Sequence, residues 1–411
     1  MKKLSNRFKE DSIFKQKDGF ILWLGQSVSQ FGDSLYNTAI GFYILELTGS
    51  TQVLGIIDGC SLVPRVFLSL IAGTFADRHN RKKIIVLMDL IRAVFLIILG
   101  ILTISGYVKL WILIFVSIIL GSCGPFFDPA IQSVKPDIVK KKYLIKYNAL
   151  FEFSSTGIWT IGRAVAGILV QILGFPIIFT INGLSFLFSG ISEMFLKIPL
   201  KEKSKEEKSF LKELKEGLRY VYKLKGLRVQ YLFIMFLNFL SKIGTILFIP
   251  LFANRYKNAA AYYGFVMMIG TIGFMLGSVI ISFIPFEKIK KSTFYILSMI
   301  IVGLIKMTIP YCENVFLISV NFFISGAFIS MTNIVNSTVL QIKIPQNMRG
   351  KVYGFRRTMN TVLLPLGAII GGYLGKILGI EETIFGAYLI CALIASLLFF
   401  SKSYKQFFNC N

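Results

Sequence analysis

Residues 73–84 read GTFADRHNRKKI, a charged segment inside an otherwise hydrophobic sequence. Six ionisable side chains fall within the seven positions from Asp77 to Lys83. Long apolar runs lie on both sides, and a run of about 18 residues or more can cross the roughly 30 Å hydrocarbon core of a bilayer as a helix. A basic hairpin between two such helices is typical of the cytoplasmic face, where Lys and Arg accumulate.

The composition of the whole chain agrees with this interpretation. Of the 411 residues, 55% are hydrophobic, and the mean hydropathy is +0.68. Because lipid offers the backbone no hydrogen bonds, long apolar segments must be helical. The sequence therefore predicts an all-α integral membrane protein in contact with the lipid bilayer.

The formal net charge of +24 has two possible causes. A soluble protein this basic would bind nucleic acid, whereas a membrane protein concentrates Lys and Arg in its cytoplasmic loops. Here the basic residues are spread over many short, alternate loops instead of one groove with stacking aromatic side chains. We therefore expect no nucleic-acid partner, and we expect both termini in the cytoplasm.

Motifs for chemistry are missing from the sequence. The five cysteines are scattered without a CxxC pair, and the chain has one histidine, so we expect no metal site. We find no GxxxxGK[ST], HExxH or GxSxG motif. The sequence predicts neither an enzyme nor a protein with a cofactor.

Apolar periodicity predicts twelve transmembrane helices in two groups of six. They are expected at about 19–46, 52–75, 84–105, 110–134, 147–171, 176–198, 229–252, 262–284, 293–311, 315–341, 351–377 and 382–401. These ranges divide the chain into a cytoplasmic tail (1–18), a first half (19–198), a central loop with an amphipathic helix (199–228), a second half (229–401) and a cytoplasmic tail (402–411).

The two halves share an internal repeat. Under a shift of 205 residues, Gly162 falls on Gly367 and Gly167 on Gly372, so that GRAVAGILVQILG lies over GAIIGGYLGKILG. Two parallel, pseudo-symmetric six-helix halves form a known transporter plan. Small residues such as Gly157, Gly162 and Gly167 let membrane helices approach closely, although ordinary helix packing explains any single glycine.

With these features in place, residues 73–84 resemble the signature loop of the major facilitator superfamily, whose pattern is roughly G-x-L-A-D-R-x-G-R-K. The matching positions are Gly73, Ala76, Asp77, Arg78, Arg81 and Lys82. Phe75 replaces the usual Leu, and Asn80 replaces the usual Gly. The combination of DRHNRKKI, Asp89, FFDPAIQSVKPDIV, LKELKEGLRYVY and PQNMRGKVYG is similar to the bacterial drug-exporter branch that includes macrolide-efflux proteins.

The resemblance implies the major facilitator fold and a role for the signature loop. The acid at Asp77 would latch the cytoplasmic ends of the two halves, together with Gly73, Arg78 and Arg81. A carboxylate is favoured near the N-terminus of a helix, which supports this role. A solvated loop charge is the alternative for Asp77. We expect Asn80 to adopt the left-handed backbone conformation that glycine would supply.

One face of the first predicted helix is polar. Gln26, Gln30, Asp33 and Asn37 recur at steps of three and four residues. Because polar groups in mid-membrane are costly, this face is expected to line a substrate cavity.

Basic residues within predicted helices are candidates to balance Asp33. Arg65 and Arg163 are the candidates that we select in the first half, and Lys242 is expected to line the cavity from the second half. Exporters of this family carry Pro after the glycine equivalent to Gly162, a position that Arg163 occupies here. Asp33 is either the proton-coupling carboxylate or part of a structural ion pair.

Other charges lie nearer the predicted helix ends. We interpret the acidic ones as interfacial or packing charges: Asp58, Asp128, Glu152 and Glu193. Lys306 is expected to extend its ammonium to the membrane surface.

The resemblance implies a secondary active transporter. We expect proton-coupled efflux of amphipathic small molecules, such as macrolide-like drugs, by alternating access of a monomer in the bacterial plasma membrane. The alternative is a dedicated carrier of a metabolite, siderophore or lipid with the same fold. A membrane-embedded enzyme or sensor would need clustered nucleophiles, histidines or a soluble domain.

Overall fold

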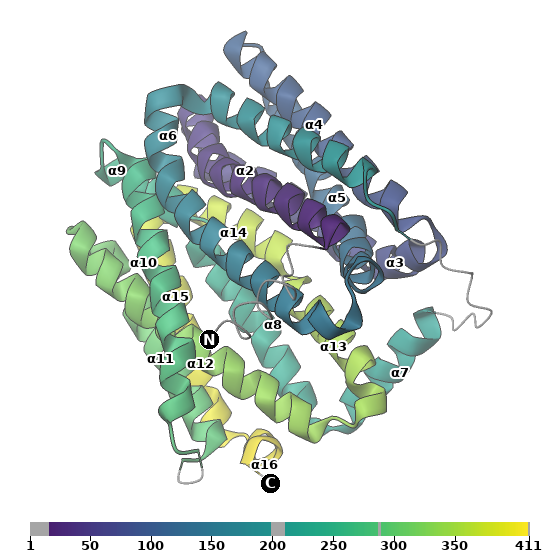
Figure 1. Ribbon diagram of the computed structural model, residues 1–411. Helices are drawn as coiled ribbons and strands as arrows, with labels where there is room; N and C mark the ends of the chain where they lie inside the picture. The colour runs from purple at the N-terminus through teal and green to yellow at the C-terminus, as the bar shows by residue number, and fades with distance from the viewer. Residues whose placement is uncertain (1–15, 199–209, 287–288, 410–411) are drawn as a thin grey trace, which may run out of the picture. The chain divides into compact units, whose positions relative to one another are not determined.

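The computed structural model describes residues 16–198, 210–286 and 289–409, and all their regular secondary structure is helical (Figure 1). Ten helical segments are long and apolar enough to cross a membrane. One of them, Lys141–Met194, contains a break, and the 32-residue α2 (Lys17–Thr48) lies outside the ten. Counting α2 and both arms of the broken segment gives the twelve predicted crossings, so the predicted fold class is confirmed.

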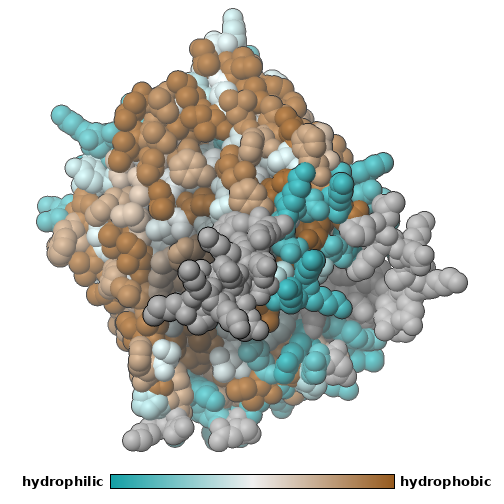
Figure 2. Space-filling model, viewed as in Figure 1, coloured by the Kyte–Doolittle hydropathy of each residue, from teal (hydrophilic) through white to brown (hydrophobic). Residues whose placement is uncertain are grey.

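The chain divides into two compact units. Unit 1 is Met1–Ile40 with Cys60–Glu206, and unit 2 is Gly41–Gly59 with Glu207–Asn411. The segment Gly41–Gly59 therefore packs with the second group of helices, although it belongs to the first group in sequence. Exposed apolar side chains are abundant in both units (Figure 2). Such surfaces are anomalous in water but expected in contact with lipid.

In the described part of the chain, five helices contribute to unit 1, although the end of the first and the start of the second fall within Gly41–Gly59 of unit 2. They are α2 (Lys17–Thr48), α3 (Thr51–Arg78), α4 (Arg81–Ile104), α5 (Leu110–Ile138) and α6 (Leu144–Met194), with a 3₁₀ turn η2 at Lys141–Tyr143. The helix α4 packs against α5 and α6. Within α6, Gly174 has a φ of 76°, which glycine adopts without strain, and Pro176 lacks a backbone donor. These two residues separate the two predicted helices at 147–171 and 176–198.

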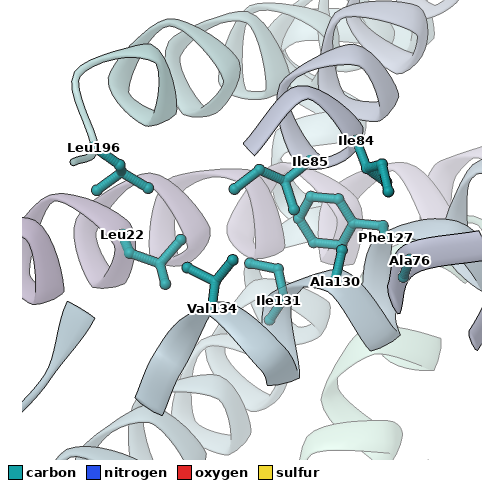
Figure 3. Packing of buried hydrophobic residues seen from close by; sticks show 9 residues of the cluster. All are labelled: Leu22, Ala76, Ile84, Ile85, Phe127, Ala130, Ile131, Val134 and Leu196. Atoms are coloured by element: carbon teal, nitrogen blue, oxygen red, sulfur yellow. The ribbon is translucent and has the colours of Figure 1, made fainter. Parts of the chain in front are cut away.

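A cluster of apolar side chains holds one end of unit 1 together. Its members come from α2, α3, α4, α5 and the second residue after the end of α6, and they point toward one another (Figure 3): Leu22, Ala76, Ile84, Ile85, Phe127, Ala130, Ile131, Val134 and Leu196. Each is at most 6% exposed. Van der Waals packing of this kind is a main stabilising force between helices in lipid. The cluster fixes the α3–α4 turn that carries the signature sequence.

The expectation for Asn80 is wrong. Asn80 has a φ of −65° and a ψ of 109°, and its side chain caps α4 by accepting the Lys83 N–H. The donor–acceptor distance is 3.2 Å. Asparagine is a favoured N-cap because its oxygen satisfies a free donor of the first helical turn. The residue therefore starts the next helix and needs no left-handed backbone.

Unit 2 contains the remaining helices. They are α7 (Phe210–Lys223), α8 (Lys225–Thr245), α9 (Phe248–Arg255), α10 (Ala259–Ile280), α11 (Lys291–Met307), α12 (Val315–Lys343), α13 (Gln346–Thr361), α14 (Leu364–Ile377), α15 (Ile380–Leu397) and α16 (Lys402–Asn409). Three 3₁₀ turns accompany them: η3 (Ile281–Phe283), η4 (Ile309–Tyr311) and η5 (Leu398–Phe400).

Two predicted helices are each divided in the structure. The helix expected at 229–252 separates into α8 and α9, and the helix expected at 351–377 separates into α13 and α14. Proline clashes with the carbonyl four residues earlier and cannot bond to it. Pro250 places this clash at Ile246, directly after α8, and Pro365 places it at Thr361, where α13 ends.

The expected amphipathic helix of the central loop corresponds to α7. Val221 is 3% exposed and packs with Tyr231 of α8 and Val352 of α13. Leu218 remains 49% exposed, while the side chains of Phe210 and Leu214, on the same predicted face, lie outside the described residues. The last segment, α16, also packs against its unit, because Tyr404 and Phe408 are buried beside Tyr295.

Glycines of α14 allow close backbone contact within unit 2. A Cβ at Gly372 would meet the Thr51 carbonyl oxygen and lie 2.9 Å from the Gly55 Cα. A Cβ at Gly367 would lie 2.8 Å from the Phe239 carbonyl oxygen. Both contacts are with backbone, which cannot rotate away. The segment Gly41–Gly59 is thus held to α14 by glycine packing.

Replacing Gly372 with alanine is expected to destabilise the protein by about 1–3 kcal/mol, as overpacking does elsewhere. The matched control is Gly386→Ala in α15, where a Cβ would meet no described atom within 4 Å. There alanine should preserve or raise stability, because it is the better helix former. Thermal unfolding of the purified protein in detergent measures both. Equal melting temperatures for the two variants would contradict the packing argument.

Candidate functional site

The most deeply buried charges of unit 1 are two carboxylates on neighbouring helices. Asp89 of α4 and Glu193 of α6 are both 0% exposed. A Cβ at Gly190, one turn before Glu193, would lie 3.4 Å from the Asp89 Cβ. Asp89 lies near enough to Glu193 for its charge to act on that carboxyl group. Burying two like charges together is costly without a counter-charge.

Arg92 supplies that counter-charge. It lies one turn after Asp89, with its Nη1 3.5 Å from Asp89 Oδ1. Its guanidinium carbon sits 4.9 Å from the ring centroid of Phe127 and 5.1 Å from that of Phe186. Arginine is attracted to aromatic faces when it is withdrawn from water. The side chain is therefore held between α5 and α6 by two rings and one acid.

Gln26 of α2 connects to the same group. Its Nε2 donates to Ser189 Oγ at 3.3 Å and to Glu193 Oε1 at 3.0 Å. Ser189 also faces the Asp89 carboxylate. The second oxygen of Glu193 has no hydrogen-bond partner among the residues that the structure describes. A buried acceptor without a partner usually marks a functional group or an ordered water.

Asp33 lies farther along the same interface. Its Oδ1 accepts a hydrogen bond from Asn182 Nδ2 at 3.2 Å, and Asn37 Nδ2 donates to its backbone oxygen at 2.7 Å. Asp33 is half-buried, whereas Asn182 is completely buried. Gln30, on the same polar face, keeps its Oε1 buried.

Glycines bring α2 and α6 together at these polar side chains. A Cβ at Gly25 would lie 3.4 Å from the Ser189 Cα, and a Cβ at Gly32 would lie 3.1 Å from the Asn182 Cα. The two glycines are seven residues apart and so share one face of α2. Their lack of side chains lets Gln26 and Asp33 reach α6.

The two predicted counter-ions of Asp33, Arg65 and Arg163, lie in different surroundings. Arg65 lies near Arg92, because a Cβ at Gly124 would be 3.9 Å from Arg65 Nε and 3.8 Å from Arg92 Nη2. Both guanidinium groups lie near enough to Asp33 to favour its negative charge. Arg163 instead stacks over Trp159, 5.3 Å from its ring centroid.

Of the two sequence interpretations of Glu193, the interfacial charge is wrong because the side chain is completely buried, whereas a packing charge agrees with the structure. Asp89 and Arg92 were not among the predicted site residues. A signal for Glu193 is present in the sequence. The polar residues of the last arm of α6 recur at steps of three, four and four, on one helix face: Asn182, Ser185, Ser189 and Glu193. The same test identified the polar face of α2.

The residues of the signature loop lie at the junction of α3 and α4. Arg81 opens α4 and pairs with Asp137 of α5, at 2.9 Å between Nη1 and Oδ2. Arg78 is exposed at the end of α3, and Gly73 lies inside that helix. Asp77 lies in the last turn of α3, but its side chain is outside the described residues. Arg81 therefore ties the loop to α5 within unit 1.

Lys242 forms an ion pair within unit 2. Its Nζ lies 2.7 Å from Asp58 Oδ2, and the two side chains are 21% and 31% exposed. Two further bonds hold the same segment: Thr51 Oγ1 donates to the Gly372 carbonyl at 2.9 Å, and Lys376 Nζ donates to Gln52 Oε1 at 3.1 Å. The charge of Lys242, which we expected to line a cavity, is balanced by Asp58.

The predicted packing glycines of α6 differ in their surroundings. A Cβ at Gly162 would lie 2.8 Å from the Ser34 Cβ, so α6 approaches α2 closely there. Gly167 is buried. A Cβ at Gly157 would meet nothing within 4 Å in the described parts of the chain.

Comparison with known proteins gives the family. The sequence profile of the Major Facilitator Superfamily matches residues 22–367 and 231–406. Macrolide efflux protein A of Streptococcus pyogenes is 25% identical over 383 residues, which cover 91% of this chain and 94% of that protein. The staphyloferrin A transporter of Staphylococcus aureus (strain NCTC 8325 / PS 47) is 23% identical over 381 residues, which cover 90% and 92%.

Among solved structures, the nucleoside transporter NupG superposes with a TM-score of 0.77 at 16% identity, covering 94% of this chain and 100% of that one. This likeness concerns the fold alone. The matched profile, by contrast, extends over most of the sequence and both units. This chain therefore belongs to the Major Facilitator Superfamily and is a multi-pass membrane transporter, not an enzyme.

Proposed function

We propose that this protein is a proton-coupled exporter of amphipathic small molecules, with macrolide-like drugs as the first class to test. The observation that carries the proposal is the burial of Asp89 and Glu193 at 0% exposure, with the guanidinium of Arg92 paired to Asp89. Ionisable groups inside a membrane are costly and commonly form proton relays. The similarity to macrolide efflux protein A over most of the chain supports the choice of substrate.

The charges of this group support proton binding. Three carboxyl groups, Asp33, Asp89 and Glu193, share two guanidinium groups, Arg65 and Arg92. One negative charge is then left uncompensated in a low-dielectric interior, and one bound proton neutralises it. In this proposal the three acids hold that proton jointly.

The polar face of α6 offers a path for the proton. Asn182 contacts Asp33, and Glu193 contacts Gln26. These two residues of α6 are eleven positions apart, about 16 Å at 1.5 Å per residue. Ser185 and Ser189 lie between them on the same face. We propose that Asp33, the least buried of the three acids, exchanges protons with water and that Asp89 and Glu193 store the charge.

Alternating access gives the remaining predicted residues their roles. Proton binding would change the balance between inward-open and outward-open states. We retain Asp77, with Gly73, Arg78 and Arg81, as the proposed latch at the cytoplasmic side. The distribution of Lys and Arg supports a bacterial plasma-membrane location with both termini in the cytoplasm. We propose that a monomer is sufficient, since each unit contains its own packed core.

A dedicated carrier is the second candidate. The staphyloferrin A transporter matches this chain over nearly the same length as the macrolide efflux protein. A carrier of one metabolite, siderophore or lipid would use the same fold and the same acids. It would differ by ignoring a panel of unrelated drugs.

Neutralising the buried acids is expected to abolish export. In a drug-sensitive bacterium, Asp89→Asn and Glu193→Gln should each reduce macrolide and dye export about ten-fold or more. Asp89→Asn leaves Arg92 without its ion-pair partner, and Glu193→Gln removes a carboxylate that accepts the proton. Asp33→Asn should have a similar effect, and a protonophore should abolish export by the wild type. Drug susceptibility and dye accumulation, at matched protein levels, measure these effects.

The control for this series is Glu152→Gln, which removes an exposed carboxylate of α6 and should leave export unchanged. Protonophore-sensitive export that survives in all three acid variants would reject the coupling role. If the wild-type protein alters neither susceptibility to nor accumulation of any compound in the panel, the result would reject drug export and favour the dedicated carrier.

Exchanging Asp58 and Lys242 tests whether their ion pair serves the transport cycle. Partly exposed pairs are worth up to about 1 kcal/mol, so Asp58→Asn and Lys242→Gln should each change transport up to about five-fold. The double variant Asp58→Lys with Lys242→Asp should return transport toward the wild-type level. Lys257→Gln, at an exposed lysine, is the control. If only Lys242→Gln lowers transport and the double variant does not restore it, the result would indicate that Lys242 contacts substrate.

A further inference from the structure

Five helices of unit 2 line a partly open cavity of about 290 Å³. It lies among α8, α11, α12, α13 and α15. Its polar lining includes two cations and four amides: Lys306, Arg356, Asn238, Asn333, Asn336 and Asn360. None of its lining residues is Asp or Glu. The cavity is therefore positive, whereas the polar group of unit 1 is rich in carboxylates.

Lys306 is the most informative residue of this cavity. It lies in the last turn of α11 and is 9% exposed, so the expectation that it reaches the membrane surface is wrong. Its Nζ is 5.4 Å from the ring centroid of Tyr388, 5.6 Å from that of Phe322 and 5.9 Å from that of Phe248. Three aromatic faces partly replace the water that the ammonium has lost.

No residue in the described part of the chain forms a hydrogen bond or ion pair with the Lys306 ammonium, and the same holds for Arg356. Aromatic contacts alone do not offset the burial of a full charge. Two unpaired cations around one cavity without an acid leave the counter-charge to come from a bound molecule. Amide groups of the four asparagines can add N–H donors to it.

The dimensions of the cavity limit the size of that molecule. Tyr295, Met299 and Lys306 line it from one face of α11, and the eleven positions from first to last extend about 16 Å. The positive charge of Arg356 lies near Tyr295 at one end of the cavity, while Lys306 lies at the other end. Apolar side chains such as Met299 and Ile329 lie along the lining. Small-molecule sites occupy about 300–1,000 Å³, so this cavity fits a small ligand and not a macrolide ring.

We propose that this cavity is a binding site for a small organic carboxylate, whose anionic group pairs with Lys306 and whose apolar body lies along α11. The site is separate from the acids of unit 1 and does not depend on proton-coupled export. A molecule bound there is either cargo or a ligand that stabilises unit 2. In both cases the recognising chemistry is the same: an anion at Lys306 and an apolar body beside it.

Ligand binding to the purified full-length protein in detergent tests the site directly. The probes are benzoate, phenylacetate and hexanoate, each compared with its neutral amide at constant ionic strength, by calorimetry and thermal unfolding. At least one carboxylate should bind saturably and raise the melting temperature, and its amide should bind ten-fold or more weakly. This comparison uses the wild type and needs no substitution to fold.

Two lysine variants complete the experiment. Lys306→Met should weaken carboxylate binding ten-fold or more, and Lys306→Arg should retain most of it. Lys290→Met, at the exposed residue that precedes α11, should bind as the wild type does. The proposal is overturned if no carboxylate binds saturably, if amides bind equally well, or if chloride displaces the carboxylate at equal concentration. A folded Lys306→Met protein with unchanged affinity would overturn it as well.

Discussion

The cost of burying charge in a bilayer is the constraint on which the polar architecture of this transporter depends. Asp89 and Glu193 are completely buried, so each needs a partner within its own bundle. Arg92 of α4 pairs with Asp89, and Gln26 of α2 donates to Glu193. The arrangement is possible only because glycines let α2 and α6 approach. A bulkier residue at Gly25 or Gly32 would separate the acids from the groups that stabilise them.

The two units place opposite charges in their interiors. Unit 1 gathers three acids around two guanidinium groups, and unit 2 encloses Lys306 and Arg356 in a cavity without an acid. The internal repeat pairs Asp33 with the cavity residue Asn238, but it does not extend to the most deeply buried charges. Under the shift of 205 positions, Asp89 corresponds to Phe294, Glu193 to Leu398 and Lys306 to Ile101. The duplicated framework therefore carries different chemistry in each half, as a transporter with separate coupling and binding sites would require.

Much of the fold follows from local sequence signals, whereas the site depends on tertiary contacts. Long apolar runs identify the crossings, and Gly174 with Pro176 marks the break in α6. The divisions at Pro250 and Pro365 were predictable from proline geometry but were hidden by hydropathy, which continues through them. Lys306 was expected at the membrane surface because a position near a helix end suggests contact with water. Its ammonium is surrounded by rings from α9, α12 and α15, and Glu193 is bonded to α2, so the burial of both depends on helices that no local window contains. The pairing of Lys242 with Asp58 is likewise set by residues 184 positions apart.

The most direct test of the account is whether the acids of unit 1 release a proton when substrate binds. Purified protein in weakly buffered detergent, with a pH indicator, would be mixed with a compound that the wild type exports. We predict release of about one proton per molecule from the wild type and from Glu152→Gln, since the three acids share one proton. Asp89→Asn and Glu193→Gln should release none while still binding the compound. Undiminished proton release from both variants would contradict the account and place the coupling group elsewhere.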